Sequence, residues 1–203
     1  MVPDAQLLSS LAANAAEALS LHSSIVYRKL VVRQPGNPRA AELLGALNPE
    51  TVLSRGKTSP CDAAAVLAAL WLRHDYLAES HQLSQAIDTP TGSYWHAIMH
   101  RREGDFWNSK YWLNKCRGHP ALAAISRQAV DVINASPADK SIMKLTLGDF
   151  DAHGFVDVVE AVHNQTPDSI PADARHDILV ALQQIEWQVL FEHSLAGAAG
   201  VVR

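Results

Sequence analysis

The sequence predicts an all-α fold: a single-domain, multi-helix bundle over residues 1–203, with a long central helix near residues 62–86. Apolar residues recur at helical spacing along most of the chain. Capping residues and prolines stand where helices would begin. One segment, 24–32, has the composition of a strand, but it has no second strand with which to form a sheet. Hydrophobic residues make up 48% of the 203 residues, which is enough for one sizeable core.

Start and stop signals divide the chain into successive helices. In order, helices are expected at 4–20, 60–87, 93–103, 105–116, 121–134, 154–164 and 172–195. Ser59-Pro60 has the form of an N-cap followed by proline in the first turn, and it begins the longest of these helices. The helix after it should end at Gly104, and Asp105 should cap the next one.

The segments between the helices are assigned to turns and loops from their composition. They are QPGNP (34–38), DTPTGS (88–93), ASPADKS (135–141) and NQTPDSIPAD (164–173). Asn48-Pro49 also has the form of a helix start. Because DTPTGS is short, the helices on either side of it should pack roughly antiparallel, which predicts that His81 lies near His96.

Composition excludes several classes of function. The net charge of −4 and the pI of about 6.2 give no general attraction to nucleic acid. No run approaches the roughly 18 apolar residues typical of a membrane span. The first twenty residues contain no Lys or Arg, so we interpret them as helix rather than as a secretory signal. Two cysteines are too few for a disulfide framework, and we therefore expect a cytoplasmic protein.

Aromatic and histidine residues are concentrated in the middle of the chain. Eight of the thirteen aromatic residues lie within 71–112, and five of the ten histidines lie within 74–119. Aromatic walls with a few convergent polar groups are typical of a ligand pocket. We therefore expect the functional site, with a small molecule as its ligand, in this region.

His96, His100 and Glu103 share one face of the expected helix at 93–103, at spacings of four and three. Such a face can supply three ligands to a divalent metal. It can equally present a histidine that a carboxylate orients for acid–base catalysis. A third interpretation is a set of hydrogen-bonded core histidines, because ten histidines in such a chain give roughly half an i,i+4 pair by chance. The cofactor stays open, with a divalent metal as one candidate.

The neighbouring residues extend this candidate site. His74 and His81 share a stripe of the expected long helix, and we assign them to a catalytic set with the three residues above. All four histidines are expected to converge in one cavity. Substrate binding is assigned to nearby aromatic and basic side chains, of which the basic ones would hold an anionic group: Tyr94, Trp95, Arg101, Arg102, Lys110 and Trp112.

Three stretches resemble a family of uncharacterised bacterial and fungal proteins. They are RHDYLAESH, GSYWHAIMHRREGDFWNSKYW and GHP, which together cover about a quarter of the chain. The family has proline where this chain has Gly104, and it differs around Cys116-Arg117. The resemblance brings no activity. It implies that the following residues belong to a common site: His74, Asp75, His81, His96, His100, Arg101, Arg102, Glu103, Asp105, Asn108, Lys110, Tyr111 and Trp112.

Two later segments have competing interpretations. Residues 149–160 have the spacing of a calcium-binding loop, but His153 stands where an oxygen ligand is needed, and no second loop pairs with it. We predict instead that Asp149 or Asp151 caps the following helix. The C-terminal helix is too evenly apolar for a free surface helix, so it should pack in the core or in the seam of a homodimer.

Three functions are compatible with these patterns. The first is an enzyme that acts on a small polar or anionic metabolite through a pocket of His, Glu and Arg side chains. The second is a small-molecule or metal-binding module without catalysis. The third is a structural or interaction protein with a polar, histidine-rich core.

Overall fold

The computed structural model describes residues 5–21, 27–55, 58–134, 140–165 and 174–201. Within these ranges the regular structure is helical, and the only β-type pairing is a single bridge between Leu11 and Leu53. The α-helices are α1 (Ala5–Leu8), α2 (Ala13–Ser20), α3 (Pro38–Gly45), α4 (Pro60–Arg73), α5 (Leu77–Ser84), α6 (Pro90–Glu103), α7 (Phe106–Leu113), α8 (Pro120–Asn134), α9 (Lys140–Met143), α10 (Ala152–Gln165) and α11 (Ala174–Ala199). The predicted all-α class is confirmed.

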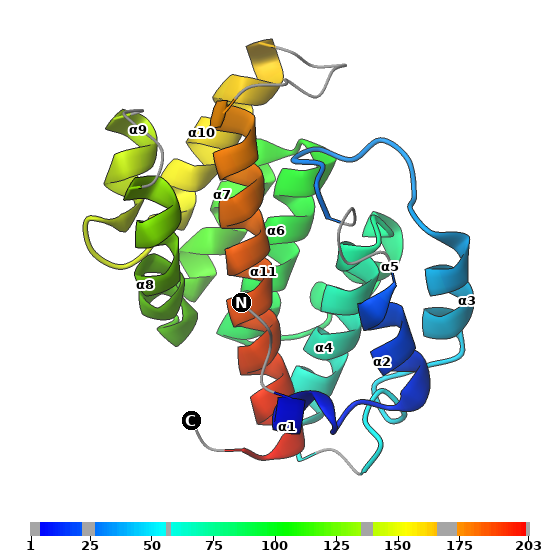
Figure 1. The fold of residues 1–203 in the computed structure, drawn as a ribbon. Helices are drawn as coiled ribbons and strands as arrows, with labels where there is room; N and C mark the ends of the chain where they lie inside the picture. Colours follow the sequence, from blue (N-terminus) through cyan, green and yellow to red (C-terminus); the bar gives the residue numbers. More distant parts are fainter. Residues whose placement is uncertain (1–4, 22–26, 56–57, 135–139, 166–173, 202–203) are drawn as a thin grey trace.

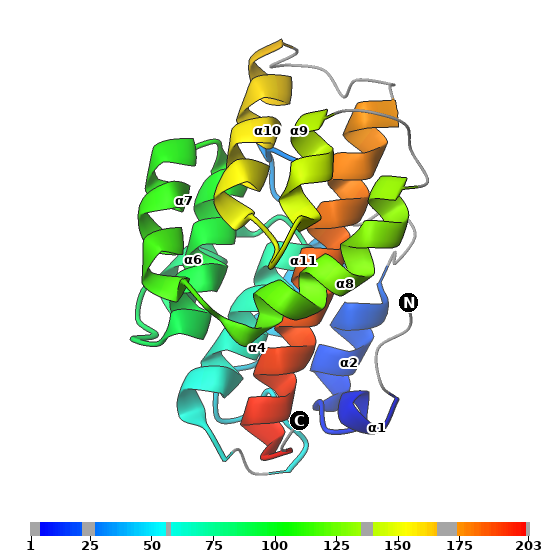
Figure 2. The same ribbon diagram turned by 90° about the vertical axis from the view of Figure 1, so that its left-hand side faces the viewer.

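Helix α11 runs through the middle of the molecule, with the other helices arranged around it (Figure 1). Helix α4 packs along it, and α8 crosses it (Figure 2). Leu179, Leu182 and Leu190 of α11 are fully buried, in a core cluster that draws on residues from Leu7 to Ala198. Burial in the chain's own core therefore accounts for the even apolarity of this helix. No helix in the described ranges is long and apolar enough to cross a membrane.

The prediction of one long helix near 62–86 is wrong, because two helices occupy this region. Helix α4 ends at Arg73 and α5 begins at Leu77, and between them Asp75 has a φ of 64°. This left-handed conformation costs most residues about 1–2 kcal/mol, and aspartate tolerates it better than most. The Asp75 carboxylate accepts a hydrogen bond from Arg102 at 2.7 Å, which helps to hold it there. No glycine or proline marks the break in the sequence.

The turn at 34–38 packs against this break. The Gly36 N–H donates to the His74 carbonyl at 3.1 Å. A Cβ atom on Gly36 would come within 2.3 Å of the same oxygen, so the close approach requires glycine. The QPGNP turn predicted from composition therefore has a packing role as well.

Several helix boundaries follow their capping signals. Helix α6 begins at Pro90, three residues before the expected Ser93, because Thr89 is its N-cap and Pro90 can occupy the first turn. The helix ends as predicted at Gly104, which has a φ of 91°. Asp105 caps α7 as predicted.

Other expected segments differ from the structure or lie outside it. Asn48-Pro49 begins a single turn rather than a helix: the Asn48 side chain accepts from the N–H groups of Glu50 and Thr51 at 2.8 and 3.1 Å, as an N-cap does, but the turn does not continue into a helix. Residues 27–32 form no strand. The loops at 135–141 and 164–173 and the first part of 24–32 fall largely outside the described residues.

The segment 149–160 forms the start of α10. Asp151 Oδ1 accepts a hydrogen bond at 2.9 Å from the N–H of the helix's third residue, so the capping interpretation is confirmed. Asp157 and Glu160, which would be two of the oxygen ligands of a calcium loop, form ion pairs with Lys110. These contacts join α10 to α7.

Candidate metal centre

Three histidines from α5 and α6 meet at one place. The ring centroids of His81 and His96 are 4.7 Å apart, those of His81 and His100 are 5.3 Å apart, and those of His96 and His100 are 4.6 Å apart. Each ring offers one nitrogen, and these nitrogens lie within 4.8 Å of one another. His96 and His100 are buried and His81 is half-buried. The predicted proximity of His81 and His96 is confirmed.

The ring of His100 is oriented by a carboxylate. Its Nδ1 lies 2.6 Å from Glu103 Oε1, and because an ionised carboxylate only accepts, Nδ1 carries the proton. The lone pair of His100 Nε2 therefore faces the cluster, where it accepts hydrogen bonds from His96 Nε2–H at 3.0 Å and from the Asn108 amide at 3.3 Å. A carboxylate on the outer nitrogen of an imidazole is typical of metal-ligating histidines.

Two histidines of this cluster, His96 and His81, favour the neutral state. Burial lowers the pKa of His96 to about 3, and positive charge at His100, His81 and Lys115 acts in the same direction. The pKa of His81 is also lowered, by burial and then by His100, against an opposing effect of Glu103. A neutral imidazole has a lone pair that is free for a metal or for a proton.

Helix α7 forms another wall of the cluster. The Trp112 ring lies 4.1 Å from the ring of His96, centroid to centroid. The Lys115 ammonium lies 3.8 Å from the centre of the Trp112 ring. Ser109 Oγ donates to the Ala97 carbonyl at 2.7 Å, which fixes α7 against α6.

Glu103 lies on the outer side of the cluster, so it does not face the same point as His81 and His96. A second set, formed by His100, Glu103 and Asp105, also brings potential ligand atoms within 4.8 Å of one another. Both carboxylates of this set are exposed, and Asp105 already accepts from the Asn108 N–H at 3.0 Å. The geometry thus groups His81, rather than Glu103, with His96 and His100 as potential ligands, while Glu103 contacts the outer nitrogen of His100.

His74 does not join the cluster, so the expectation of four converging histidines is wrong for this residue. Its ring is buried at the C-terminal end of α4, where Nε2 lies 2.8 Å from the Ala18 carbonyl of α2. The physical reason is the break at Asp75. Because the helix does not continue, His74 and His81 no longer lie on one helical stripe.

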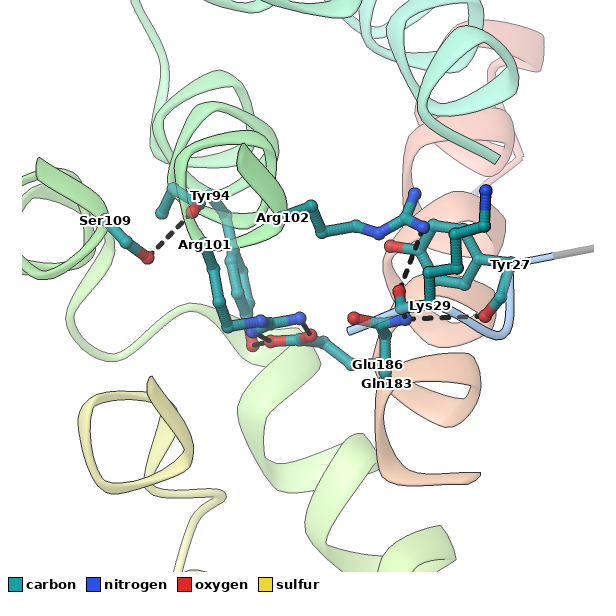
Figure 3. A network of polar contacts seen from close by, with 9 residues as sticks. Tyr27, Lys29, Tyr94, Arg101, Arg102, Ser109, Gln183 and Glu186 are labelled. Atoms are coloured by element: carbon teal, nitrogen blue, oxygen red, sulfur yellow. Dashed lines mark hydrogen bonds and ion pairs between the residues drawn. The ribbon is translucent and has the colours of Figure 1, made fainter. Parts of the chain in front are cut away.

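Arg101 enters a polar network in the core (Figure 3). Its two terminal nitrogens lie 3.2 and 2.5 Å from the two carboxylate oxygens of Glu186 in α11, and both side chains are fully buried. The Tyr94 hydroxyl donates to Glu186 at 3.1 Å. Burial and the Glu186 carboxylate raise the pKa of Tyr94, so it stays a neutral donor.

Arg102 is also buried, and it holds the segment from Tyr27 onward against the bundle (Figure 3). It donates to the carbonyls of Leu72 and Lys29 at 2.6 and 3.1 Å and pairs with Asp75. Its guanidinium carbon lies 4.0 Å from the centre of the Tyr27 ring. Three atoms here are buried without a hydrogen-bond partner: the Nε atoms of both arginines and the Tyr27 hydroxyl.

Of the six side chains assigned to substrate binding, the structure places Trp112 against the histidine cluster. Tyr94, Arg101 and Arg102 lie in the core network, and the indole N–H of Trp95 donates to Ser194 of α11 at 3.0 Å. Lys110 pairs with Asp157 and Glu160 of α10. Arg101 and Arg102 lie in the segment that was expected to bind substrate, but both side chains bind groups of this chain that are distant in the sequence.

Two residues of the cluster were absent from that assignment. Asn108 contacts His100, and Lys115 covers Trp112. Asn108, Trp112 and Lys115 follow one another at spacings of four and three, the same spacing that identified the histidine face of α6. In comparisons with known proteins, no family model, no curated protein and no solved structure matched this chain.

Proposed function

We propose that this protein binds a divalent transition metal, with Zn²⁺ as the reference ion, through His81, His96 and His100. The supporting observation is the 3.0 Å separation of two facing Nε2 atoms, one of them on a ring that Glu103 orients from behind. Adjacent nitrogens of a tetrahedral zinc site with ordinary Zn–N bonds lie roughly 3.3 Å apart. His96 and His100 therefore already have nearly the spacing of neighbouring ligands.

The chemistry of the donors supports the same class of metal. Three imidazoles suit zinc, copper, nickel and cobalt better than calcium or magnesium, which prefer oxygen ligands. The lowered pKa values of His81 and His96 keep both rings neutral at neutral pH, so each ring has one nitrogen lone pair and no second proton has to leave before a metal binds. His81 is half-buried, and its nearest ring nitrogen lies within 4.8 Å of those of the other two histidines.

Three protein ligands leave one position of a tetrahedral site open. Open sites are characteristic of catalytic rather than structural zinc, because a bound water there acquires a pKa near neutrality. We therefore favour metal-assisted hydrolysis or hydration of a small polar substrate over a purely structural role. Arg101 and Arg102 have no part in this proposal, since both are committed to internal partners. Both cysteines are free thiols, which supports a reducing compartment such as the cytoplasm.

A zinc titration of the chelator-treated, full-length chain tests the proposal. Isothermal calorimetry should give one zinc per chain, and a saturating 100-fold excess over the dissociation constant should add about 2.7 kcal/mol to the free energy of unfolding. His96→Ala and His100→Ala should bind zinc at least 100-fold more weakly, with little change in the stability of the metal-free protein. His163→Ala, which removes a histidine of α10 outside the cluster, is the matched control and should bind normally.

Two results would contradict this function. One is zinc binding that His96→Ala leaves unchanged. The other is a large and similar loss of stability in both cluster variants together with no metal binding by the wild type. That second pattern is expected of a structural histidine network, in which removal of one partner strands the other and costs about 1–3 kcal/mol.

A further inference from the structure

Helix α7 carries two aromatic rings on the surface. Trp107 is 77% exposed and Tyr111 is 47% exposed. They stand one turn apart, with their ring planes within 14° of parallel and their centroids 6.2 Å apart. These two exposed and nearly parallel rings offer apolar ring faces to a ligand, and we call the pair the α7 platform.

The α7 platform is linked to the histidine cluster by ring contacts. Tyr111 meets Trp112 edge to face at 5.7 Å, and Trp112 in turn lies 4.1 Å from His96. Along this path, only the rings of Tyr111 and Trp112 lie between Trp107 and His96. A ligand that extends from Trp107 along the helix can therefore reach the proposed metal centre.

Positive charge lies just beyond the C-terminal end of α7. The Lys115 ammonium lies between Tyr111 and Trp112, 5.0 and 3.8 Å from their ring centres, and forms no ion pair within the described ranges. Arg117 follows it, hydrogen-bonded to the neutral side chain of Asn114. The acidic groups of the site, Glu103 and Asp105, lie beyond the opposite end of the helix. In a chain with a net charge of −4, this is a local surface for an anion.

We propose that the α7 platform is the substrate-binding surface of the metal centre, and that its ligand joins a flat ring to an anionic group, as a nucleotide does. The ring stacks on Trp107 and Tyr111, and the anion lies between Lys115 and the metal. Stacking on aromatic side chains tolerates different rings, while the ammonium and the metal select the negative charge. This inference rests on the proposed metal site.

The size of the α7 platform favours a small ligand over a second protein. A stable protein–protein interface buries about 800 Å² on each partner. Two ring faces provide only a fraction of that area. A nucleotide-sized molecule needs no more than one flat apolar surface and a cation close by.

Three probes separate the two halves of the ligand: adenosine monophosphate, adenosine and ribose 5-phosphate. Binding to the zinc-loaded, full-length chain is followed by calorimetry and by quenching of tryptophan fluorescence. Adenosine monophosphate should bind more tightly than either fragment. Trp107→Ala should weaken the binding of both ring-containing probes about ten-fold or more and leave ribose 5-phosphate unaffected. Lys115→Ala should affect only the two phosphate-containing probes.

Two controls accompany these variants. Leu147→Ala removes an 83% exposed apolar side chain elsewhere and should change no affinity. Zinc affinity, measured in every variant, should be retained in Trp107→Ala, which lies outside the histidine cluster. In Lys115→Ala zinc affinity should not fall, because the variant removes a positive charge that acts on His96.

The inference is overturned if zinc-loaded wild-type protein binds none of the three probes, or if Trp107→Ala binds them equally well. It is also overturned if the chain forms a dimer that Trp107→Ala dissociates, because the rings would then be a protein contact. Failure of zinc uptake overturns the proposed function separately. Adenosine binding that still depends on Trp107 would in that case retain the ring half of the inference alone.

Discussion

Helix α6 presents a different polar group on each of two sides, and the two groups are built on different principles. On one side, both terminal nitrogens of Arg101 meet the carboxylate of Glu186, so each charge faces its opposite. On the other side, His96 and His100 turn their Nε2 atoms toward each other across a single N–H···N hydrogen bond, with His81 beside them. In the first arrangement each charge is matched by its opposite within the chain. In the second, the remaining ring nitrogen of His96, Nδ1, is buried without a hydrogen-bond partner among the described residues.

This comparison shows that the type of a buried polar residue says less than what it faces. Arginine is the side chain best suited to bind an anionic substrate, yet Arg101 and Arg102 both bind groups of their own chain. Histidine is often a satisfied core residue, yet His96 makes one hydrogen bond through Nε2 and leaves Nδ1 buried without a partner among the described residues. The unused bonding capacity of α6 that matters for the proposed function therefore lies on its histidine side.

The largest effect is expected when the buried Arg101–Glu186 pair is disrupted. Glu186→Gln leaves the Arg101 charge buried without its counter-charge and should lower the free energy of unfolding by about 3–5 kcal/mol in urea denaturation. The double variant Arg101→Met/Glu186→Leu removes both charges and should lose much less. A loss below about 1 kcal/mol in the single variant would show that the pair does not hold the charge as described.

His119, a buried histidine outside the cluster, should make the stability of the protein depend on pH, and this dependence can be compared with the behaviour of the cluster. His119 is satisfied on both nitrogens, by Thr91 at 3.1 Å and by the Ala121 N–H at 3.1 Å, and burial followed by His193 lowers its pKa to about 4. The unfolded chain, with an ordinary histidine pKa near 6.5, then binds more protons between these values. The contribution of His119 is therefore complete above pH 6.5 and is lost as the pH falls toward 4.

Urea denaturation of the metal-free protein at several pH values measures this loss, which should reach at most about 3 kcal/mol. In His119→Gln the decline should be shallower but still present, because His96 also has a lowered pKa. Parallel pH profiles for the wild type and the variant would contradict the assignment to His119.

The smallest effect is expected from a change in the contact between Glu103 and His100, and it concerns zinc binding. Glu103→Gln keeps the hydrogen-bonding shape but removes the charge that orients His100, and it should weaken zinc binding about 10- to 100-fold. Glu79→Gln changes the same charge on the neighbouring helix α5, away from the imidazole, and is the matched control. Calorimetry measures the zinc affinity of both variants. If both bind zinc equally more weakly than the wild type, Glu103 acts only through its long-range electrostatic field and not through its contact with His100.

Much of the fold could be predicted because its signals are local. Ser59, Gly104 and Asp105 act on the turn next to them, and each does what its residue type predicts. The break at Asp75 could not be predicted, because an aspartate in the left-handed region is held there by Arg102, 27 residues later. The same break removed His74 from the site.

The histidine cluster was partly predictable for a similar reason. Two of its members are set by spacing on one helix, and the third is brought close by a short linker. The burial of Arg101 was not predictable, because its partner lies 85 residues further along the chain and nothing near Arg101 indicates an internal carboxylate. The outward role of Glu103 depends on which nitrogen of His100 it meets, and spacing does not determine that.

The distance between Arg101 and Glu186 also sets an order of events during synthesis. A ribosome completes α6 long before it produces α11, so in the growing chain the arginine has no counter-charge and that side of α6 stays hydrated. Docking of α11 then completes the apolar core and neutralises the arginine together. The residues of the histidine cluster all come from 81–115, and none of them belongs to α11. The proposed metal site is thus encoded entirely in chain that is synthesised before the partner of Arg101.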